Sequence, residues 1–441
     1  MSKNTFYISC PIDCYSGYSS RSRDVVKALI QMDKYDVKII PQRWGATPQG
    51  FIDDHKEEWG FLKEYIHQGQ LTEQPDYWMQ ITVPNESQAV GKFNIILTAG
   101  IETTACAPQW IEGCNRMDLV LVSSEHSKKI FQDVQYNKQD QQGNVVGALK
   151  LEKPIQVLME GVDLDTYKVL ETKSEFENVE LFNSLDSINE SFSYLYLGHW
   201  MQGDLGEDRK NVGLLIKAFY ETFKNKSNQP ALILKTSGAG SCYMDRREIQ
   251  RKIDSIKKSC PSSKLPKVYL LHGDFTDNEI NEIYNHPKVK AMVSLTKGEG
   301  FGRPLLEFSL TNKPIITTGW SGHMDFLSPN FTTLLGGELK DIHPSAQVKD
   351  ILIEGSQWFS PDLNHVGHAL IEVKEKYKDY KVKGKRQGYH SRSKFSFDNM
   401  VDQLKDIITN NFTEVAKQVE LKLPTLKKLE LPKLKKLEIN E

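Results

Sequence analysis

The 441-residue sequence lacks the features that mark several common protein classes. Its 56 Lys and Arg residues against 58 Asp and Glu leave a formal net charge of -2, which excludes a polycation that coats nucleic acid or anionic lipid along its whole length. No apolar run approaches the roughly 18 residues that a membrane-spanning helix needs. The first residues also lack the long apolar region of a secretory signal, so we expect a cytoplasmic protein.

The sequence also has few of the patterns that hold metals. Its six cysteines show neither a CxxC pair nor the spacing of zinc ligands. They are Cys10, Cys14, Cys106, Cys114, Cys242 and Cys260. The 11 histidines form neither an HExxH nor an HxxxH pattern. We therefore expect reduced thiols, no metal site and no bound cofactor.

What the sequence does contain is a regular alternation of short apolar runs with helical patterns, which is typical of parallel sheets with crossover helices. The expected strands of a first series are residues 6–9, 37–40, 77–82, 93–99 and 119–124. Those of a second series are residues 194–199, 231–236, 268–271, 291–295 and 314–318. Two series in tandem predict an α/β fold of two Rossmann-like domains whose parallel sheets face each other across a cleft. Ligands of such sheets bind at the carboxyl ends of the strands.

Changes in composition predict the domain boundaries. A polar, irregular stretch at 170–190 separates an N-terminal Rossmann-like domain at 1–175 from a C-terminal one at 176–390. Ser396 can cap a helix, and we expect residues 391–411 to include a helix that packs back across both domains.

The tail at 412–441 differs in kind from the rest of the chain. LPTLKKLE and LPKLKKLE repeat in register, and their prolines exclude one continuous helix. Six Lys and two Glu lie between Leu421 and Glu438. This basic tail is either a solvated appendage or a docking segment for a partner protein or a polyanionic acceptor.

The stretch from residue 293 to residue 327 carries the most chemistry. A strand ends at Leu295, and the glycine-rich loop KGEGFGR leads into a helix with Pro304 in its first turn. Glycines let the main chain lie close to a ligand, and unpaired amides at a helix start suit a phosphate or a sugar hydroxyl. Glu299 in the loop and Glu307 one turn into the helix can face the same cleft, one to grip a hexose and the other a ribose.

The segment from Glu299 to Glu307, EGFGRPLLE, resembles the glycosyltransferase family 4 type of GT-B enzyme, which carries Glu-x7-Glu in an EGFGxPxxE context. The resemblance extends over most of residues 5–411. It implies the GT-B fold, with an acceptor-side N-terminal domain and a nucleotide-sugar-binding C-terminal domain. It also implies that Glu299 and the loop hold the donor sugar, while Glu307 binds the donor ribose. The other donor-binding candidates of the loop are Gly300, Phe301, Gly302 and Arg303.

Two positions in the N-terminal half also match the family. The turn at Gly17 looks like the glycine-bearing loop after the first strand, where the backbone approaches the diphosphate and the acceptor. Glu102, within TAGIETTACAPQW, lies in a loop that faces the acceptor in similar proteins. We treat Glu102 as an acceptor-side candidate, with a structural carboxylate as the alternative.

The sequence departs from the family pattern at one place that concerns the phosphates. Family members place an Arg after the glycine that ends the first strand of the second domain, but here His199 follows Gly198. Arg209 and Lys210 resemble a variant of that cationic site, although Arg209 alone also fits a solvated cation at a helix start. Lys235 ends an expected strand and can supply further positive charge at the same edge.

These residues predict sugar transfer. Negative charge builds up on the β-phosphate as a sugar leaves a nucleoside diphosphate, and in a metal-free site cations and helix-end amides stabilise it. We therefore expect a metal-independent glycosyltransferase that moves a sugar from a nucleotide-diphosphate sugar, with a UDP-sugar as the expected donor, to an acceptor hydroxyl. The resemblance implies retention at the anomeric carbon. The alternatives are a nucleotide-sugar-binding protein without turnover and a same-fold nucleotide-sugar epimerase.

The acceptor is open between two classes. Parts of the N-terminal half look like glycosyltransferases of large tailed bacteriophages, some of which modify hydroxymethylated pyrimidines in DNA. With DNA as the acceptor, the protein would act in the host cytoplasm, and Arg21, Arg23, Lys27 and the basic tail would contact phosphates in a salt-dependent manner. A glycan or lipid-linked acceptor is the alternative, although no basic, aromatic helix is evident near the N-terminal part of the cleft.

Overall fold

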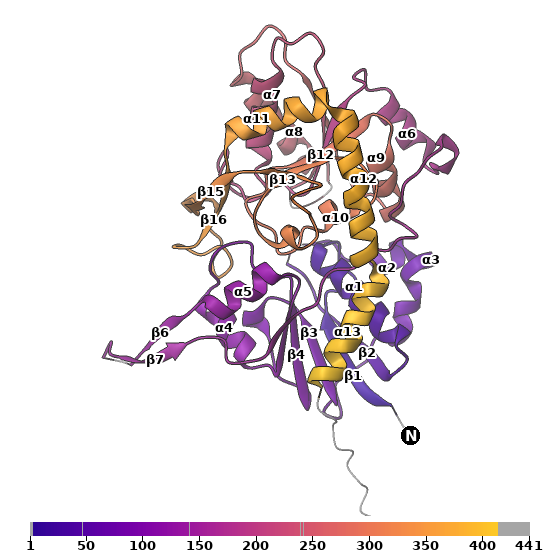
Figure 1. Ribbon diagram of the computed structural model, residues 1–441. Coiled ribbons are helices and arrows are strands. Elements are labelled where there is room, and N and C mark those ends of the chain that lie inside the picture. Colours follow the sequence, from indigo (N-terminus) through magenta and orange to yellow (C-terminus); the bar gives the residue numbers. More distant parts are fainter. Residues whose placement is uncertain (1–2, 46, 141, 239, 241, 413–441) are drawn as a thin grey trace, which may run out of the picture.

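The computed structural model of the chain describes residues 3–45, 47–140, 142–238, 240 and 242–412 (Figure 1). Two α/β domains are stacked on each other, and each is built on a six-stranded parallel sheet. The contact between them includes the loops that follow β4 and β12, so the carboxyl ends of strands from both sheets lie at the junction.

The sheet of the N-terminal domain has the strand order β2-β1-β3-β4-β5-β8. Its strands are β1 (Asn4–Cys10), β2 (Tyr35–Pro41), β3 (Tyr77–Ile81), β4 (Phe93–Thr98), β5 (Leu119–Val122) and β8 (Ile155–Val157). Ile8 lies beside Ile39 on one neighbouring strand and Met79 on the other, and all three are fully buried. Parallel strands covered by helices on both faces need such continuous apolar runs, because neither face contacts water.

The sheet of the C-terminal domain has the order β11-β10-β9-β12-β13-β14. Its strands are β9 (Ser193–Leu197), β10 (Ala231–Lys235), β11 (Lys267–Leu271), β12 (Val289–Ser294), β13 (Ile315–Thr318) and β14 (Thr333–Leu335). Leu195 at its centre lies between Ile233 and Met292, again fully or almost fully buried. Both sheets therefore place their central strands, which precede the functional loops, in a rigid core.

The helices cover the two sheets. They are α1 (Gly17–Gln31), α2 (Phe51–Asp54), α3 (Lys56–Trp59), α4 (Pro108–Asn115), α5 (Glu125–Asp133), α6 (Val179–Asp186), α7 (Val212–Phe223), α8 (Tyr243–Lys258), α9 (Asp277–Asn285), α10 (Arg303–Ser309), α11 (Leu363–Glu375), α12 (Tyr377–Lys394) and α13 (Phe397–Asn411). α1 begins where Ser16 Oγ accepts a hydrogen bond from the Ser19 amide at 3.1 Å. Its buried residues Val25, Val26 and Leu29 share one face and pack on the N-terminal core.

The chain returns to the N-terminal domain at its end. The Val162 amide donates to the Phe395 carbonyl at 3.0 Å, and the Phe397 amide donates back to the Val162 carbonyl at 2.8 Å. Beyond this link, α13 buries Met400 and Leu404 completely in the N-terminal core. Figure 1 shows α12 on the C-terminal domain and α13 on the N-terminal domain, with one short connection between them.

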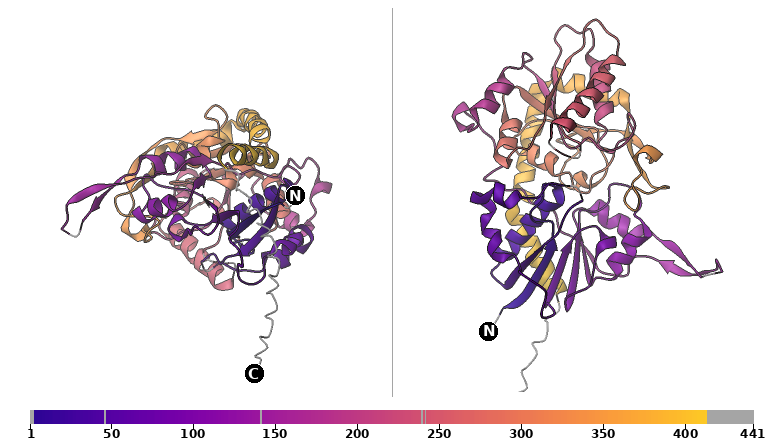
Figure 2. Two further views of the ribbon diagram at one scale, coloured as in Figure 1. Left: turned by 90° about the horizontal axis from the view of Figure 1, so that it is seen from below. Right: turned by 180° about the vertical axis from the view of Figure 1, so that it is seen from behind.

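Two antiparallel hairpins stand outside the main sheets, and the sequence did not predict them. β6 (Tyr136–Gln139) and β7 (Val145–Leu149) form an arm that projects from the N-terminal domain (Figure 2). β15 (Gly337–Asp341) and β16 (Gln357–Pro361) form the second hairpin. The Thr104 amide donates to the Gln357 carbonyl at 2.9 Å, so this second hairpin also contacts the N-terminal domain.

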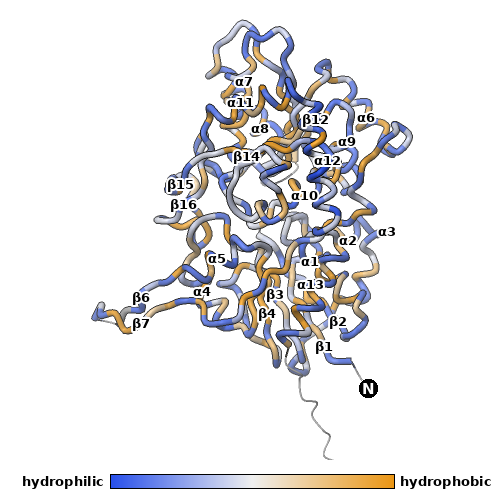
Figure 3. Tube along the Cα trace, in the orientation of Figure 1, coloured by the Kyte–Doolittle hydropathy of each residue, from blue (hydrophilic) through white to orange (hydrophobic). Residues whose placement is uncertain are grey.

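The expectation of an α/β fold with two Rossmann-like domains is confirmed. Every strand expected from the sequence is present, because each combines an apolar run with flanking turn residues, and the hydropathy trace marks β3 and β4 as hydrophobic segments (Figure 3). Among the residues that the structure describes, no helix has both the length and the apolar composition needed to cross a membrane.

Candidate active site

The glycine-rich loop between β12 and α10 lies where the two domains touch. A methyl group at Gly298 would stand 1.9 Å from the carbonyl oxygen of Glu102, and one at Gly300 would stand 2.4 Å from that of Ala99. Both carbonyls belong to the loop that follows β4 in the other domain. At these two positions the main chain of the N-terminal domain leaves no room for a side chain. Glycine is therefore required here even without a bound ligand.

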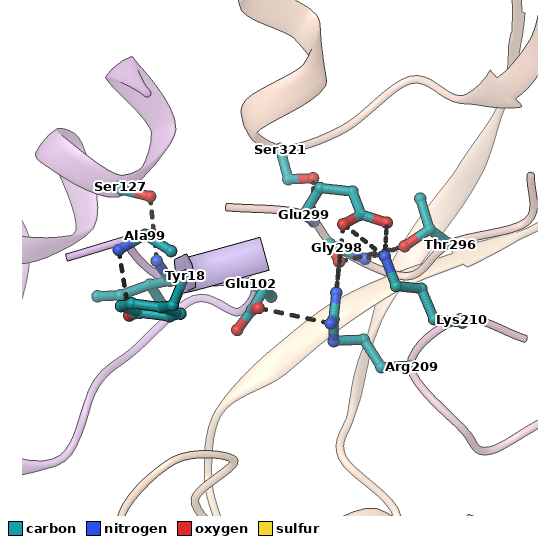
Figure 4. A network of polar contacts seen from close by, with 11 residues as sticks. Tyr18, Ala99, Glu102, Ser127, Arg209, Lys210, Thr296, Gly298, Glu299 and Ser321 are labelled. Atoms are coloured by element: carbon teal, nitrogen blue, oxygen red, sulfur yellow. Dashed lines mark hydrogen bonds and ion pairs between the residues drawn. The ribbon is translucent and has the colours of Figure 1, made fainter. Parts of the chain in front are cut away.

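Glu299 follows in this loop and turns its carboxylate toward Lys210 (Figure 4). The Lys210 ammonium donates hydrogen bonds to Oε1 and Oε2 of Glu299 at 2.6 and 2.8 Å. The main-chain amide of Glu299 donates to Ser321 Oγ at 2.9 Å, which fixes the base of the side chain. Lys210 lies just before α7, so the contact joins the loops that follow the neighbouring strands β9 and β12.

Arg209 connects this pair to the N-terminal domain. Its guanidinium donates to the Gly298 carbonyl at 2.7 Å and lies 3.4 Å from Oε2 of Glu299. A second nitrogen lies 3.6 Å from Oε1 of Glu102 across the domain junction. The side chain of Arg209 is only 12% exposed, so all three contacts are shielded from water. The structure thus brings four of the predicted residues, Glu102, Arg209, Lys210 and Glu299, into one network.

The charges in this network reinforce one another. Burial alone would raise the pKa of Glu299, but Lys210 and Arg209 lower it to about 2. The carboxylate is therefore ionised at neutral pH, and together with Glu102 it balances the charges of Lys210 and Arg209. A ligand that contacts this network meets fixed charges in a site with little solvent, where electrostatic interactions are strong.

The loop also presents main-chain donors. The amides of Gly300, Phe301 and Gly302 donate to no acceptor within the described part of the chain. All three residues are buried. Buried amides at the start of a helix are normally paired, so an anionic or hydroxyl-bearing ligand is the partner that this loop suits.

Glu307 belongs to a second network at the same domain junction. Arg303 Nε donates to its Oε1 at 3.0 Å, and the Tyr284 hydroxyl donates to its Oε2 at 3.1 Å. Arg303 also forms an ion pair with Asp24 of α1 in the N-terminal domain. Burial raises the pKa of Glu307 to about 7, although Arg303 opposes this effect. The two glutamates of the motif are thus held by different partners.

The remaining predicted residues lie outside both networks. Lys235, at the end of β10, places its ammonium 5.4 Å from the ring centroid of Phe275, and burial lowers its pKa. His199, in the place of the family's Arg, has Nδ1 3.2 Å from Ser237 Oγ. Gly17 begins α1 and has open space where a side chain would extend.

Two aromatic contacts near the site were missed by sequence reasoning. The Tyr18 hydroxyl accepts a hydrogen bond from the Ala99 amide at 3.1 Å, and its ring stacks on Trp44 with the centroids 4.0 Å apart. His126 packs edge-on against Trp320 of the other domain at 4.7 Å, and burial lowers its pKa to about 4. Tyr18 lies in α1 and His126 in α5, and each meets a loop tryptophan that is distant in the sequence, so no spacing in the sequence would have selected these contacts.

The expectation that Arg21 and Arg23 contact DNA phosphates is wrong. Arg21 is 2% exposed and donates to the Leu158 carbonyl, while Arg23 is 4% exposed and donates to the Ile12 carbonyl at 3.0 Å. Their guanidinium groups satisfy main-chain oxygens inside the domain and do not reach the surface. Lys27 is partly exposed and lies 3.5 Å from Asp163. The basic tail lies outside the described residues.

No group of three or more His, Cys, Asp or Glu side chains in the described part of the chain could hold a metal ion. All six cysteines are unpaired, and only Cys242 is exposed.

The architecture of the whole chain is similar to that of solved glycosyltransferases. HepE from Anabaena in complex with UDP and glucose aligns over 92% of this chain and 99% of its own, with a TM-score of 0.61 and 14% identity. A glycosyltransferase from Rickettsia africae aligns over 93% and 100%, with a TM-score of 0.61 and 13% identity. Sucrose-phosphate synthase from Thermosynechococcus elongatus aligns over 92% and 98%, with a TM-score of 0.59 and 12% identity.

The chain has the GT-B fold. No protein-family model and no curated protein matches its sequence. At these low identities the structural likeness concerns the fold alone, so the membership in family 4 and the bacteriophage origin stay predictions.

Proposed function

We propose that the protein is a glycosyltransferase that moves a sugar from a UDP-sugar to an acceptor hydroxyl, with retention at the anomeric carbon. The observation that carries the proposal is the buried Lys210–Glu299 pair beside the unpaired amides of Gly300, Phe301 and Gly302. Cations, a carboxylate and free amides at the carboxyl edge of a parallel sheet match what a nucleotide sugar needs. The Anabaena HepE structure of the same fold contains UDP and glucose, which supports this class of donor.

The donor would lie along the glycine-rich loop. Glu299 and the loop amides would hold the hydroxyls of the sugar, and Glu307 would bind the ribose once Arg303 yields part of its contact. Arg303 can do so because it also pairs with Asp24, which keeps it neutralised. The two glutamates would thus bind different parts of the donor, in line with the different side chains that hold them in the structure.

The leaving diphosphate would be stabilised by Lys210 and Lys235, which end or follow neighbouring strands. Lys210 already carries a counter-charge in Glu299, so its position is fixed before the donor binds. We assign Arg209 to the phosphates only in part, because the Gly298 carbonyl and two carboxylates occupy its guanidinium. Its larger role would be to hold the two domains together at the reacting atoms. The reaction itself would need no metal ion.

The acceptor would enter from the N-terminal side, where Glu102 of the loop after β4 pairs with Arg209. A modified base in DNA and a glycan both fit a hydroxyl acceptor. Burial of Arg21 and Arg23 removes two of the DNA contacts expected from the sequence, and leaves Lys27 and the basic tail as candidates.

The test is UDP release from a panel of UDP-sugars, with and without duplex DNA that carries hydroxymethylated pyrimidines or with a glycan panel. We expect acceptor-dependent UDP release that K210A reduces by about 100- to 1,000-fold. Tight UDP-sugar binding without turnover on any acceptor would instead indicate a binding protein, and conversion of the donor without an acceptor would indicate an epimerase. Transfer to DNA that falls steeply with salt would identify the acceptor class.

A further inference from the structure

Helix α12 buries small and polar residues and exposes apolar ones, which is the reverse of the usual pattern. Its buried residues are small or polar, namely Gly384, Gln387, Gly388 and Ser391. Two of its apolar side chains face outward instead, since Val382 is 56% exposed and Tyr389 is 73% exposed, while Tyr377 and Tyr380 are partly buried. An ordinary surface helix does the reverse, and places its apolar stripe against the core.

The buried side explains why α12 lies where it does. A methyl group at Gly384 would stand 2.7 Å from the main chain of Lys313, and one at Gly388 would stand 2.8 Å from the Ser309 carbonyl. Gln387 Nε2 donates to the Phe326 carbonyl at 2.7 Å. Small residues and one buried amide therefore seat the helix tightly against the chain around α10. The outward face is not needed for this packing.

The outward face forms one continuous stripe. Its exposed residues follow the spacing of a single helix face and are Lys378, Lys381, Val382, Lys385, Arg386, Tyr389 and Ser393. With exposed Lys394 at its end, this stripe, here called the α12 face, is about 24 Å long. A shallow groove beside it is lined by Phe331, Val382 and Tyr389 together with the aliphatic stems of Lys385 and Arg386. Figure 1 shows α12 on the outer surface of the C-terminal domain.

The positive charge of the α12 face is not neutralised by the protein. Within the part of the chain that the structure describes, none of its lysines or Arg386 forms an ion pair, and the nearest pair along the chain joins Lys376 to Glu372. Asp379 is the one exposed acidic residue within the helix. Lys290, which lies 5.8 Å from the Tyr377 ring centroid, adds another cation near the start of the helix.

Charge selects the occupant of this surface. The tail at 412–441 is itself basic, with six Lys and two Glu between Leu421 and Glu438, so it would be repelled. A second copy that presents the same face would be repelled for the same reason. Nucleic acid has the required negative charge, but phosphate contacts do not need an apolar centre. An anionic lipid surface matches both features, because lysines and arginines meet the headgroups while Val and Tyr enter the interface.

We propose that the α12 face is a docking surface for an anionic lipid membrane. Lys381, Lys385 and Arg386 would contact the lipid phosphates, and Val382 and Tyr389 would insert at the level of the headgroups. The protein would then work as a peripheral membrane protein. This inference rests on α12 alone and is independent of the proposed sugar transfer.

The experiment is co-sedimentation of the full chain with vesicles of equal parts phosphatidylglycerol and phosphatidylcholine, and with vesicles of phosphatidylcholine only. Three variants are compared with the wild type: K381E/K385E/R386E, V382S/Y389S, and the control R247E/K257E/K258E on exposed positions of α8, which changes the net charge equally. All these positions are exposed, and those in α12 face away from the packing described above, so we expect every variant to fold normally. Thermal unfolding that matches wild type checks this.

We expect binding to the anionic vesicles only. Each cation lost should weaken it by roughly fivefold, so the first variant should bind at least fiftyfold more weakly, the second severalfold more weakly, and the control within about twofold of wild type. Equal vesicle binding by the first variant and the control would overturn the proposal. It would show that the binding comes from the basic tail or from net charge, and not from the α12 face. Binding of duplex DNA that the first variant loses and V382S/Y389S keeps, without vesicle binding, would make the face a nucleic-acid surface and would also overturn it.

Discussion

The ammonium group of Lys210 lies 2.6 and 2.8 Å from the two carboxylate oxygens of Glu299, although the residues are 89 positions apart in the chain. The pair joins the loops that follow β9 and β12, which are neighbours in the sheet. Because both side chains are largely buried, removal of either partner leaves the other as an uncompensated charge. The pair therefore couples the stability of the site to its proposed chemistry.

Replacement of Lys210 by Ala should reduce UDP release from the preferred UDP-sugar by about 100- to 1,000-fold, because the leaving diphosphate loses a fixed cation. Steady-state kinetics of UDP release measure this directly. The control is K217A, which removes a lysine of the adjacent helix α7 that lies beside α11. Equal activity of K210A and K217A would exclude Lys210 from the reaction.

Replacement of Glu299 by Gln should destabilise the protein by about 3 kcal/mol at neutral pH, since Lys210 and Arg209 lose their shared counter-charge. The pKa of Glu299 is lowered to about 2, so its contribution to stability is complete above about pH 4.5 and disappears as the pH falls through 2. Urea unfolding should therefore show wild type and E299Q converging at low pH. The exposed change E338Q on β15 should match wild type throughout. A constant difference at every pH would contradict this account.

The sequence predicted those parts of the structure that depend on local pattern. Apolar runs located every strand of both sheets except the short strands β8 and β14, and the Glu-x7-Glu spacing located a loop that does lie at the domain junction. The partners of these residues were not predictable. Arg303 contacts Asp24 across 279 positions of sequence, and such a pair exists only after the domains have packed.

Burial was the second quantity that the sequence did not reveal. Arg21 and Arg23 look like surface cations because they lie in a polar segment of the sequence. They are nevertheless buried and donate hydrogen bonds to main-chain carbonyls. Gly384 and Gly388 break the usual pattern of a helix, and only the contact with the end of α10 and the residues that follow it explains them. Both cases depend on tertiary contacts that override local propensity.

Replacement of Glu307 by Gln should change how stability depends on pH. Burial raises the pKa of Glu307 to about 7, so the folded state holds a proton that the unfolded state releases near pH 4.5. Wild type should therefore lose about 3 kcal/mol of unfolding free energy relative to E307Q between pH 4.5 and pH 7. Chemical denaturation at closely spaced pH values measures the difference. Parallel curves for the two proteins would show that Glu307 keeps an ordinary pKa.

Replacement of Gly300 by Ala should weaken the contact between the domains, because the new methyl group would stand 2.4 Å from the Ala99 carbonyl. We expect a loss of about 2 kcal/mol in unfolding free energy and weaker UDP binding. G147A on the projecting arm is the matched control, since that position has open space around it. Wild-type stability of G300A would mean that the two loops do not touch in solution.

The most direct test is an experimental structure of the protein with UDP bound. We expect the diphosphate to contact the ammonium groups of Lys210 and Lys235, with the ribose hydroxyls on Glu307. UDP bound elsewhere on the chain, or bound with Glu307 and Lys210 both out of contact, would contradict it.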